Sequence, residues 1–141
     1  MRIVLTMLAP VAELELPANV RLTPQRRAIL DAVERQGGSF TVVQVYDRAR
    51  RREPSLGLAT VYRTIELLRT TGSIRQLTGA AEGAYVRCHT GHHHHLVCLS
   101  CGAVEDTELC GAPSAAVLQR RHGFSAQSHE LDVYGLCARC A

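Results

Sequence analysis

The chain has no tryptophan, no lysine and no long hydrophobic segment. Aromatic residues make up 4% of its 141 residues, so an apolar core must come mainly from Leu, Val, Ile and Ala. No stretch approaches the roughly 20 apolar residues that a membrane-spanning helix needs, which excludes a membrane protein of that kind. The length suffices for one ordinary domain or for two small ones.

The first 87 residues contain neither cysteine nor histidine. All six Cys and all seven His follow, beginning at Cys88. The first part therefore lacks the side chains that soft metals prefer, whereas the second part is rich in them. We place a domain boundary near residue 87, with residues 21–87 and 88–141 as the two domains.

Charge divides at the same place. The 16 basic residues are all Arg, and residues 1–87 carry 13 of them against 8 acidic residues, a net charge of +5. Residues 88–141 carry 3 Arg against 5 acidic residues, a net charge of −2. A basic domain beside a mildly acidic one predicts an anionic partner for the first domain.

Residues 1–20 begin MRIVLTMLAPVAELEL, with one Arg, a short apolar run and early acidic residues. This is a poorly formed signal peptide. We interpret the segment as a poorly ordered leader of a cytoplasmic protein, with Met7 as an alternative start.

Helical spacing of apolar residues marks three segments of the first domain: RLTPQRRAILDAVER, TVVQVYDRARRR and LATVYRTIELLRTTG. Thr23 is an expected N-cap, Pro24 suits the first helical position, and Gly72 closes the third segment. IRQLTGAAEGAYVRC is then expected to form two short strands around a Gly/Ala turn. Three helices and a hairpin predict a winged helix-turn-helix.

The third helical segment is the candidate reader of the DNA major groove. Its expected apolar stripe comprises Leu58, Val61, Ile65 and Leu68. Arg can pair with guanine through two hydrogen bonds, Tyr or Thr can contact thymine methyls or phosphates, and an Arg before the first helix can enter a minor groove. The residues that we expect to contact DNA are Arg21, Thr60, Tyr62 and Arg63. The nearby run of Arg48 and residues 50–52 is either a solvated surface or a phosphate contact.

Two C-x-x-C pairs, CLSC and CARC, lie in the second domain. Structural zinc takes four ligands in a tetrahedron, and a C-x-x-C turn presents two sulfurs from one tight knuckle. The residues expected to form such a site are Cys98, Cys101, Cys137 and Cys140. A redox pair, or disulfides in a secreted protein, are the alternatives, but paired knuckles beside many His favour metal.

Four consecutive histidines precede the first knuckle. On a strand, successive side chains point to opposite faces. His92 and His94 would then face one way, and His93 and His95 the other, so the run predicts two pairs of ligands for two metal sites. A solvated strand without metal is the alternative.

The sequence resembles the ferric uptake regulator superfamily, and most of all its zinc uptake regulators. The resemblance covers the chain from about Arg21 to the end and rests on LTPQRRAIL, GLATVYRTIELL, YVRC, GHHHHLVCLSCG, HGF and CARC. It implies an α+β fold, with a winged helix-turn-helix domain followed by a small α/β dimerisation domain. It also implies a homodimeric transcription factor, not an enzyme, with no membrane association and no small-molecule substrate. Such proteins bind inverted-repeat operators in double-stranded DNA when loaded with metal, and usually repress metal-uptake genes.

The resemblance also assigns the metal sites residue by residue. The four Cys of the two knuckles match a structural zinc site. Cys88, His93 and His95 match three ligands of a regulatory zinc site at the hinge between the domains. The residues that match a further site in the dimerisation domain are His92, His94 and His129. The matches to DNA-contacting residues are Tyr62 and Arg63 in the recognition helix and Arg21 before the first helix.

Two positions depart from the family pattern. Arg75 stands where zinc regulators supply a fourth regulatory ligand, and an Arg side chain cannot bind zinc. The candidates to replace it are Gln76, Glu82, His89 and a water molecule. The further site normally takes a Glu near residue 112, where this chain has Ala112 and Pro113. Either Glu108 or Cys110 replaces it or the site is lost, in which case Cys110 is expected to be a buried thiol.

A thiolate among imidazoles suits zinc better than the nitrogen and carboxylate ligand sets of iron or manganese sites. Phe40 also favours zinc over iron, because iron-sensing and peroxide-sensing members of the superfamily usually have a His near that position. We therefore expect a zinc-responsive regulator. The alternatives are an iron, manganese or peroxide sensor of the same superfamily and a non-sensing zinc-ribbon interaction protein. A zinc hydrolase is disfavoured because no H-E-x-x-H or comparable motif is present.

Overall fold

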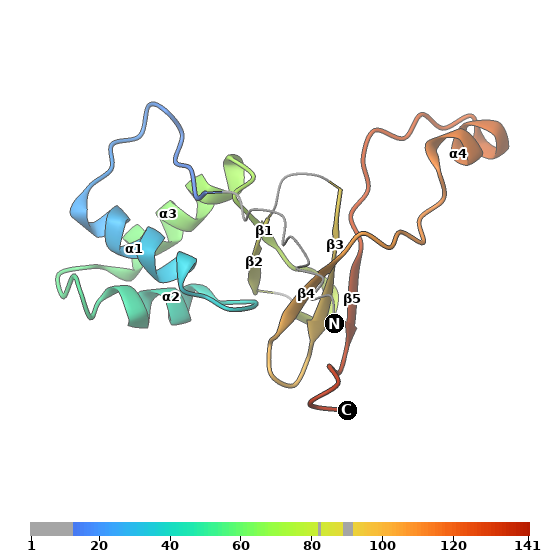
Figure 1. Cartoon of the computed structure of the whole chain (residues 1–141). Coiled ribbons are helices and arrows are strands. Elements are labelled where there is room, and N and C mark those ends of the chain that lie inside the picture. The colour runs from blue at the N-terminus through green and yellow to red at the C-terminus, as the bar shows by residue number, and fades with distance from the viewer. Residues whose placement is uncertain (1–12, 82, 89–91) are drawn as a thin grey trace, which may run out of the picture.

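The computed structural model describes residues 13–81, 83–88 and 92–141, and the predicted α+β architecture is confirmed (Figure 1). In chain order the elements are α1 (Pro24–Glu34), α2 (Val42–Ala49), α3 (Leu58–Thr70), β1 (Ile74–Gln76), the short 3₁₀ helix η1 (Gly79–Ala81), β2 (Tyr85–Arg87), β3 (His94–Cys98), β4 (Val104–Thr107), α4 (Ala115–His122) and β5 (Asp132–Gly135). No helix among these residues is long and apolar enough to span a membrane.

Helices α1 and α2 begin at side-chain caps. The Thr23 hydroxyl accepts a hydrogen bond from the backbone N–H of Arg26, and Pro24 occupies the first turn of α1. Thr41 and Gln44 form a reciprocal capping box at the start of α2. These contacts satisfy backbone N–H groups that the first turn of a helix leaves without partners, so both helix starts are encoded locally.

Helices α1 to α3 pack around one apolar core, which includes Ile29, Val45 and Ile65. Leu58, predicted to belong to the apolar stripe of α3, is instead 40% exposed. It is the first residue of α3, and helical side chains tilt toward the N-terminus of their helix, so its side chain extends past the end of the core.

Strands β1 and β2 form the antiparallel hairpin that the sequence predicts after α3. The hairpin lies between the three helices and the second sheet (Figure 1). Leu77 and Val86 from the hairpin are buried together with Val97 of β3, and Val104 and Tyr134 pack against them. The hairpin and the second sheet therefore share a small apolar core across the boundary predicted near residue 87.

The second sheet has the strand order β4-β3-β5. Strand β3 pairs antiparallel with β4 and parallel with β5. The strand expected for the histidine run begins at His94, so His92 and His93 precede it. Between β4 and β5 the chain leaves the sheet to form α4, which stands apart at the end of two extended connections (Figure 1). None of the residues of α4 is buried.

Residues 13–20 of the expected leader pack against the helical part of the protein. Leu14 and Leu16 contact its core, and the backbone N–H of Glu15 donates to the Ser73 hydroxyl at 3.0 Å. This segment therefore has defined contacts where the sequence predicts a poorly ordered leader, because its two Leu side chains find apolar partners. Residues 1–12, including Met7, lie outside the described residues.

Candidate metal centres and DNA-contacting surface

The two cysteine knuckles meet at one edge of the second sheet. Cys98 ends β3, and Cys137 follows β5 by two residues. Because β3 and β5 are parallel neighbours, their carboxyl ends lie at the same edge. The structure thereby gathers the four-cysteine group, Cys98, Cys101, Cys137 and Cys140, whose sulfur atoms lie within 4.8 Å of one another.

Backbone N–H groups favour the thiolate form of one member of this group, Cys98. Hydrogen bonding from the backbone of Cys101 first, and of Cys137 next, lowers the pKa of Cys98 to about 6. The thiolate is the form of cysteine that binds metal. Four thiolate donors from two tight turns fit the tetrahedral coordination of structural zinc.

His93, His95 and Asp106 form a second group, which we call the hinge group, with ligand atoms within 4.8 Å of one another. His95 is 2% exposed, and its Nε2 atom has no hydrogen-bond partner among the described residues. The nearest Asp106 oxygen is 3.6 Å from Nε2. A buried ring nitrogen that faces a second imidazole and a carboxylate fits a metal ligand, because unpaired buried polar atoms are otherwise costly.

Asp106 is the member of the hinge group that the sequence analysis missed. It lies on β4 directly opposite His95 in the antiparallel register. The sequence feature that could have indicated Asp106 as a ligand is a carboxylate a few residues after the first knuckle. The segment that carries it can fold back and pair with the histidine strand. Without the register, Asp106 cannot be distinguished from its neighbour Glu105.

The resemblance predicts that Cys88 is a ligand together with His93 and His95, but its thiol is not part of the hinge group in the structure. Among the described residues, the ligand atoms within 4.8 Å of one another are those of His93, His95 and Asp106, without the Cys88 thiol. Cys88 follows β2 and is half-buried, and burial raises the pKa of its thiol. Arg75, which lies nearby, opposes that shift.

Of the proposed substitutes for Arg75 as a ligand, Gln76 is not among the described members of the hinge group. The Gln76 amide oxygen accepts a hydrogen bond from Arg69 at 3.1 Å. Glu82 and His89 lie outside the described residues. Arg75 itself pairs with Asp132 of β5, and it thereby connects the hairpin to the second sheet.

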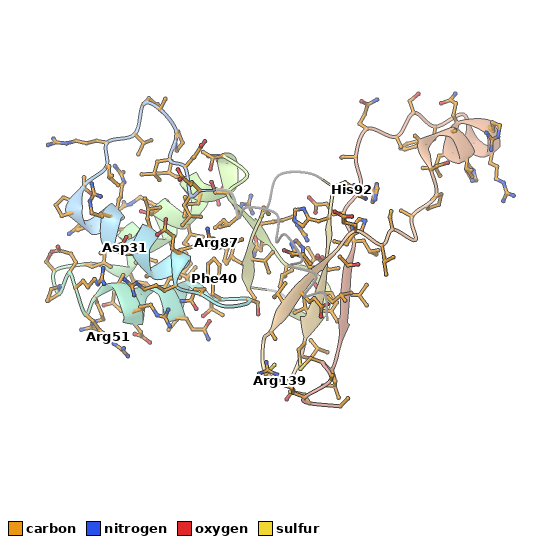
Figure 2. The ribbon with its side chains drawn as sticks, viewed as in Figure 1. Asp31, Phe40, Arg51, Arg87, His92 and Arg139 are labelled. Carbon is orange, nitrogen blue, oxygen red and sulfur yellow. The ribbon has the colours of Figure 1, made fainter. Side chains whose placement is uncertain are left out.

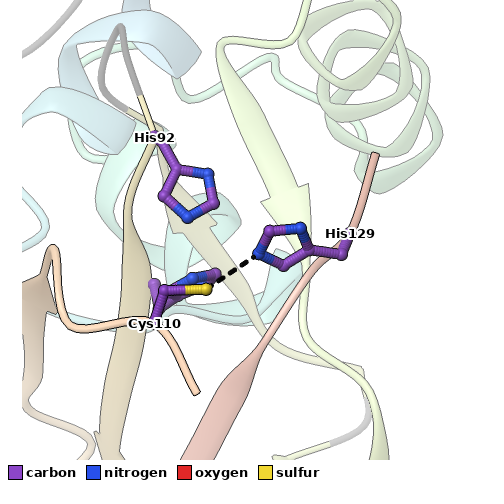
Figure 3. A group of neighbouring side chains, drawn as sticks. His92, Cys110 and His129 are labelled. Carbon is purple, nitrogen blue, oxygen red and sulfur yellow. Dashed lines mark hydrogen bonds between the residues drawn. The ribbon is translucent and has the colours of Figure 1, made fainter. Parts of the chain in front are cut away.

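The third group, which we call the loop group, comprises His92, His94, Cys110 and His129 (Figure 3). Cys110 precedes α4 and His129 follows it, and the Cys110 Sγ atom lies 3.2 Å from His129 Nε2. Cys110 is exposed rather than the buried thiol expected of an unused residue, because the connection to α4 runs along the surface. Glu108, the other candidate, is not part of this group of described residues.

His94 is the buried member of the loop group. It is 1% exposed, and neither ring nitrogen has a hydrogen-bond partner among the described residues. Burial lowers its pKa, and the neighbouring His92 and His129 lower it further. A neutral imidazole with an unused lone pair is the form that binds metal. Thus the His run divides by parity between the loop group and the hinge group.

The candidate DNA-contacting residues lie mostly at the surface of the helical part. Tyr62 on α3 is 53% exposed, and Arg63 beside it and Arg21 before α1 are also exposed. Thr60 is only partly exposed, and its carbonyl accepts the hydroxyl of Thr64. The exposed pair on α3 can therefore approach a partner without unfolding the core.

The Arg run at the end of α2 has contacts within the protein. Arg52 forms an ion pair with Asp31 at 2.9 Å, Arg48 donates to the carbonyl of Arg35, and the Arg50 guanidinium lies over the ring of Tyr46. Figure 2 shows Arg51 at the outer edge of the helical part, on the same side as α2. Most Arg side chains of this run therefore contact other residues of the helical part, which weakens the interpretation that they bind DNA phosphates.

Comparison with known proteins shows similarity along most of the chain. A sequence profile of the ferric uptake regulator family matches residues 17–134. The zinc uptake regulation protein of Mycobacterium tuberculosis is 40% identical over 127 residues, which cover 87% of this chain and 96% of that protein. The peroxide operon regulator of Bacillus subtilis is 30% identical over 86% of this chain and 85% of that protein. A solved structure of a zinc uptake regulator in complex with zinc and DNA is 29% identical, with a TM-score of 0.64 over 86% of this chain and 84% of that one.

Proposed function

Because this chain belongs to the ferric uptake regulator family, we propose that it is a zinc-responsive transcriptional regulator. As a metal-loaded homodimer it binds inverted-repeat operators in double-stranded DNA and represses metal-uptake genes. It acts in the cytoplasm, where such an operator lies. The family consists of transcription regulators rather than enzymes, and we assign no catalytic residues to this chain.

The donor set of the metal groups is the observation that carries the choice of zinc. The four-cysteine group offers only thiolates, and the loop group combines a thiol with three imidazoles. Soft sulfur donors favour zinc over iron(II) and manganese, which prefer nitrogen and oxygen ligands. Family membership alone does not decide which signal the protein senses, because the Bacillus subtilis relative is a peroxide operon regulator.

We assign a separate role to each metal group. The four-cysteine group holds structural zinc, which ties the ends of β3 and β5 together. The hinge group holds the regulatory ion, and the nearby Cys88 approaches it when metal binds. The loop group holds a third ion. This ion links the two connections on either side of α4, through Cys110 and His129, to the histidine run.

DNA recognition is assigned to α3. Its exposed Tyr62 and Arg63 side chains suit base edges and phosphates in a major groove, and Arg21 suits the adjacent backbone or minor groove. The net charge of +5 in residues 1–87 adds a favourable, salt-dependent attraction to phosphate. DNA affinity is therefore expected to fall as salt concentration rises.

Homodimerisation is supported by the apolar surface of the second sheet. Leu96 and Val133 on neighbouring strands are exposed, as is Leu136 just after β5. Helix α4 also lacks buried residues. Apolar surface of this kind commonly marks an interface, and a second copy of the chain that covers it would place two α3 helices on one operator.

The proposed response to zinc follows from the position of the hinge group. The hinge group lies on the second sheet, and Arg75 links the neighbouring hairpin to His95. A metal ion there favours one arrangement of the DNA-binding part relative to the dimer. Metal and operator then raise each other's affinity by the same factor.

Operator binding measured across a buffered zinc series tests this function. We expect specific binding that rises with free zinc and does not rise with manganese or iron(II) at their physiological concentrations. A response to manganese, iron or peroxide instead would identify one of the alternative sensors. Absence of operator binding under every metal condition would favour the zinc-ribbon interaction protein.

A further inference from the structure

Arg75 connects β1 of the hairpin to the second sheet through a cluster of polar groups. Its guanidinium forms two hydrogen bonds with the Asp132 carboxylate, one of them 3.0 Å long, and lies 3.4 Å from Glu130. The Nη2 atom of Arg75 also lies 2.7 Å from Nδ1 of His95. The Arg75 side chain is 19% exposed and that of Asp132 is 6% exposed, so water competes little for these contacts.

Nδ1 of His95 thus faces a donor and an acceptor at once. Besides the Arg75 nitrogen, the Asp132 Oδ1 atom lies 3.2 Å away. A neutral imidazole carries a proton on one nitrogen only. If Nδ1 accepts a hydrogen bond from Arg75, the proton is on Nε2. If Nδ1 donates to Asp132, the proton is on Nδ1 and the lone pair of Nε2 is free.

The two tautomers differ in whether the hinge group can bind metal. Nε2 of His95 points toward Asp106 at 3.6 Å and belongs to the same group as His93. A protonated Nε2 cannot bind a metal ion. A carboxylate that accepts the other ring N–H is the usual support of a metal-bound histidine, and Asp132 has the position for that role.

We propose that Arg75 and Asp132 control the hinge group in opposite directions through the tautomer of His95. Arg75 holds His95 in the form that excludes metal, and its positive charge also opposes a nearby dication. Asp132 supports the form that binds metal. Binding of metal therefore requires Arg75 to leave Nδ1, and because Arg75 belongs to β1, this release changes how the hairpin is held on the second sheet.

This inference rests on the proposed function to the extent that the hinge group binds zinc, but it makes a prediction that a structural ion pair does not. If Arg75 and Asp132 only stabilised the fold, removing either would weaken the same contact and change metal affinity in the same direction. Control through the His95 tautomer requires changes of opposite sign.

The experiment uses the full-length dimer with its structural zinc, in a His129→Ala background that removes one ligand of the loop group. Zinc affinity is measured by competition with a chelator for Arg75→Met, Asp132→Asn and the matched control Arg35→Met. Arg35 is an exposed Arg at the C-terminal end of α1 and is not a member of the hinge group. We expect Arg75→Met to bind zinc at least about tenfold more tightly and Asp132→Asn to bind about 10–100-fold more weakly, the usual effect of losing a carboxylate that supports a ligand. Arg35→Met should match the parent, and Arg75→Lys, which keeps the charge but loses the paired hydrogen bonds, should lie between the parent and Arg75→Met.

Nitrogen-15 NMR of the His95 ring supplies a readout that does not depend on affinity. The metal-free parent should carry its proton on Nε2, and both zinc and the Arg75→Met change should move it to Nδ1. Affinity changes of the same sign for Arg75→Met and Asp132→Asn, or a proton on Nδ1 in the metal-free parent, would overturn the inference. Neither readout involves DNA, so failure of the proposed function would be seen separately, as operator binding that does not respond to zinc.

Discussion

Ser39 donates both its backbone N–H and its hydroxyl to the carbonyl oxygen of Gly102, each at 3.0 Å. Ser39 lies in the connection between α1 and α2, and Gly102 directly follows the first cysteine knuckle. Gly102 has a φ of 72°, a left-handed conformation that glycine adopts without strain. The knuckle is therefore joined to the helical part of the protein as well as to the sheet.

Gly38→Ala should disrupt this junction. A Cβ atom at residue 38 would lie 2.6 Å from the backbone oxygen of Gly102, which cannot move like a flexible side chain. We expect a loss of about 1–3 kcal/mol in the free energy of unfolding, the usual cost of overpacking, measured by denaturation of the zinc-loaded protein. Gly37→Ala is the matched control, because a Cβ atom there meets nothing within 4 Å. Equal stabilities of the two variants would contradict the close contact.

Cys98→Ser should remove structural zinc. The change leaves three thiolates for one ion and releases the end of β3 from the segment after β5. We therefore expect insoluble or monomeric protein. Elemental analysis measures the zinc content. Cys88→Ser is the control for solubility and dimerisation only, because that thiol lies outside the four-cysteine group. A soluble, dimeric Cys98→Ser protein that still binds operator would show that this zinc is not structural.

Arg63→Ala should weaken operator binding without altering the metal groups. An Arg–guanine pair contributes roughly 1–3 kcal/mol of discrimination, and Arg63 is exposed on α3, away from the core. Operator affinity is measured together with zinc content and dimerisation, which should both be unchanged. Unchanged affinity would refute the assignment of α3 as the recognition helix.

His93→Ala and His92→Ala should differ although they change adjacent residues. His93 belongs to the hinge group and His92 to the loop group. We expect His93→Ala to abolish the response of operator binding to zinc, and His92→Ala to respond at higher zinc or with reduced amplitude. Zinc-titrated operator binding measures both. Indistinguishable titrations would mean that the two groups do not have separate roles.

Cys110→Ser should weaken metal binding in the loop group only. The thiol is the one sulfur donor among three imidazoles there, and a hydroxyl is a poorer zinc ligand than a thiolate. We expect zinc affinity of this group to fall at least about tenfold in a chelator competition, while the hinge group is unaffected. His122→Ala is the control, because His122 is an exposed histidine at the end of α4 and is not a member of the loop group. A Cys110→Ser protein with the affinity of the parent would exclude this residue as a ligand.

Short-range patterns in the sequence were sufficient for much of this protein. Thr23-Pro24 predicts the start of α1, and the C-x-x-C spacing predicts two knuckles, because caps and tight turns depend on residues a few positions apart. The alternation of a strand predicts that neighbouring histidines separate, and they do so even though His92 and His93 precede β3. The resemblance to the ferric uptake regulator family, carried by the same local motifs, is confirmed by the match over residues 17–134.

Only the tertiary structure decided which distant residues complete each group. Asp106 reaches His95 through the register of β3 with β4, and Cys110 rather than Glu108 reaches His129 through the path of the chain around α4. Arg75, read from the sequence as a position that had lost its ligand, is paired with Asp132, 57 residues away. Local sequence sets helix caps and the direction of successive side chains, whereas strand register and loop path depend on how the whole chain packs. For that reason the sequence alone predicted the donors in the histidine run and the cysteine pairs, and the folded chain determined their partners.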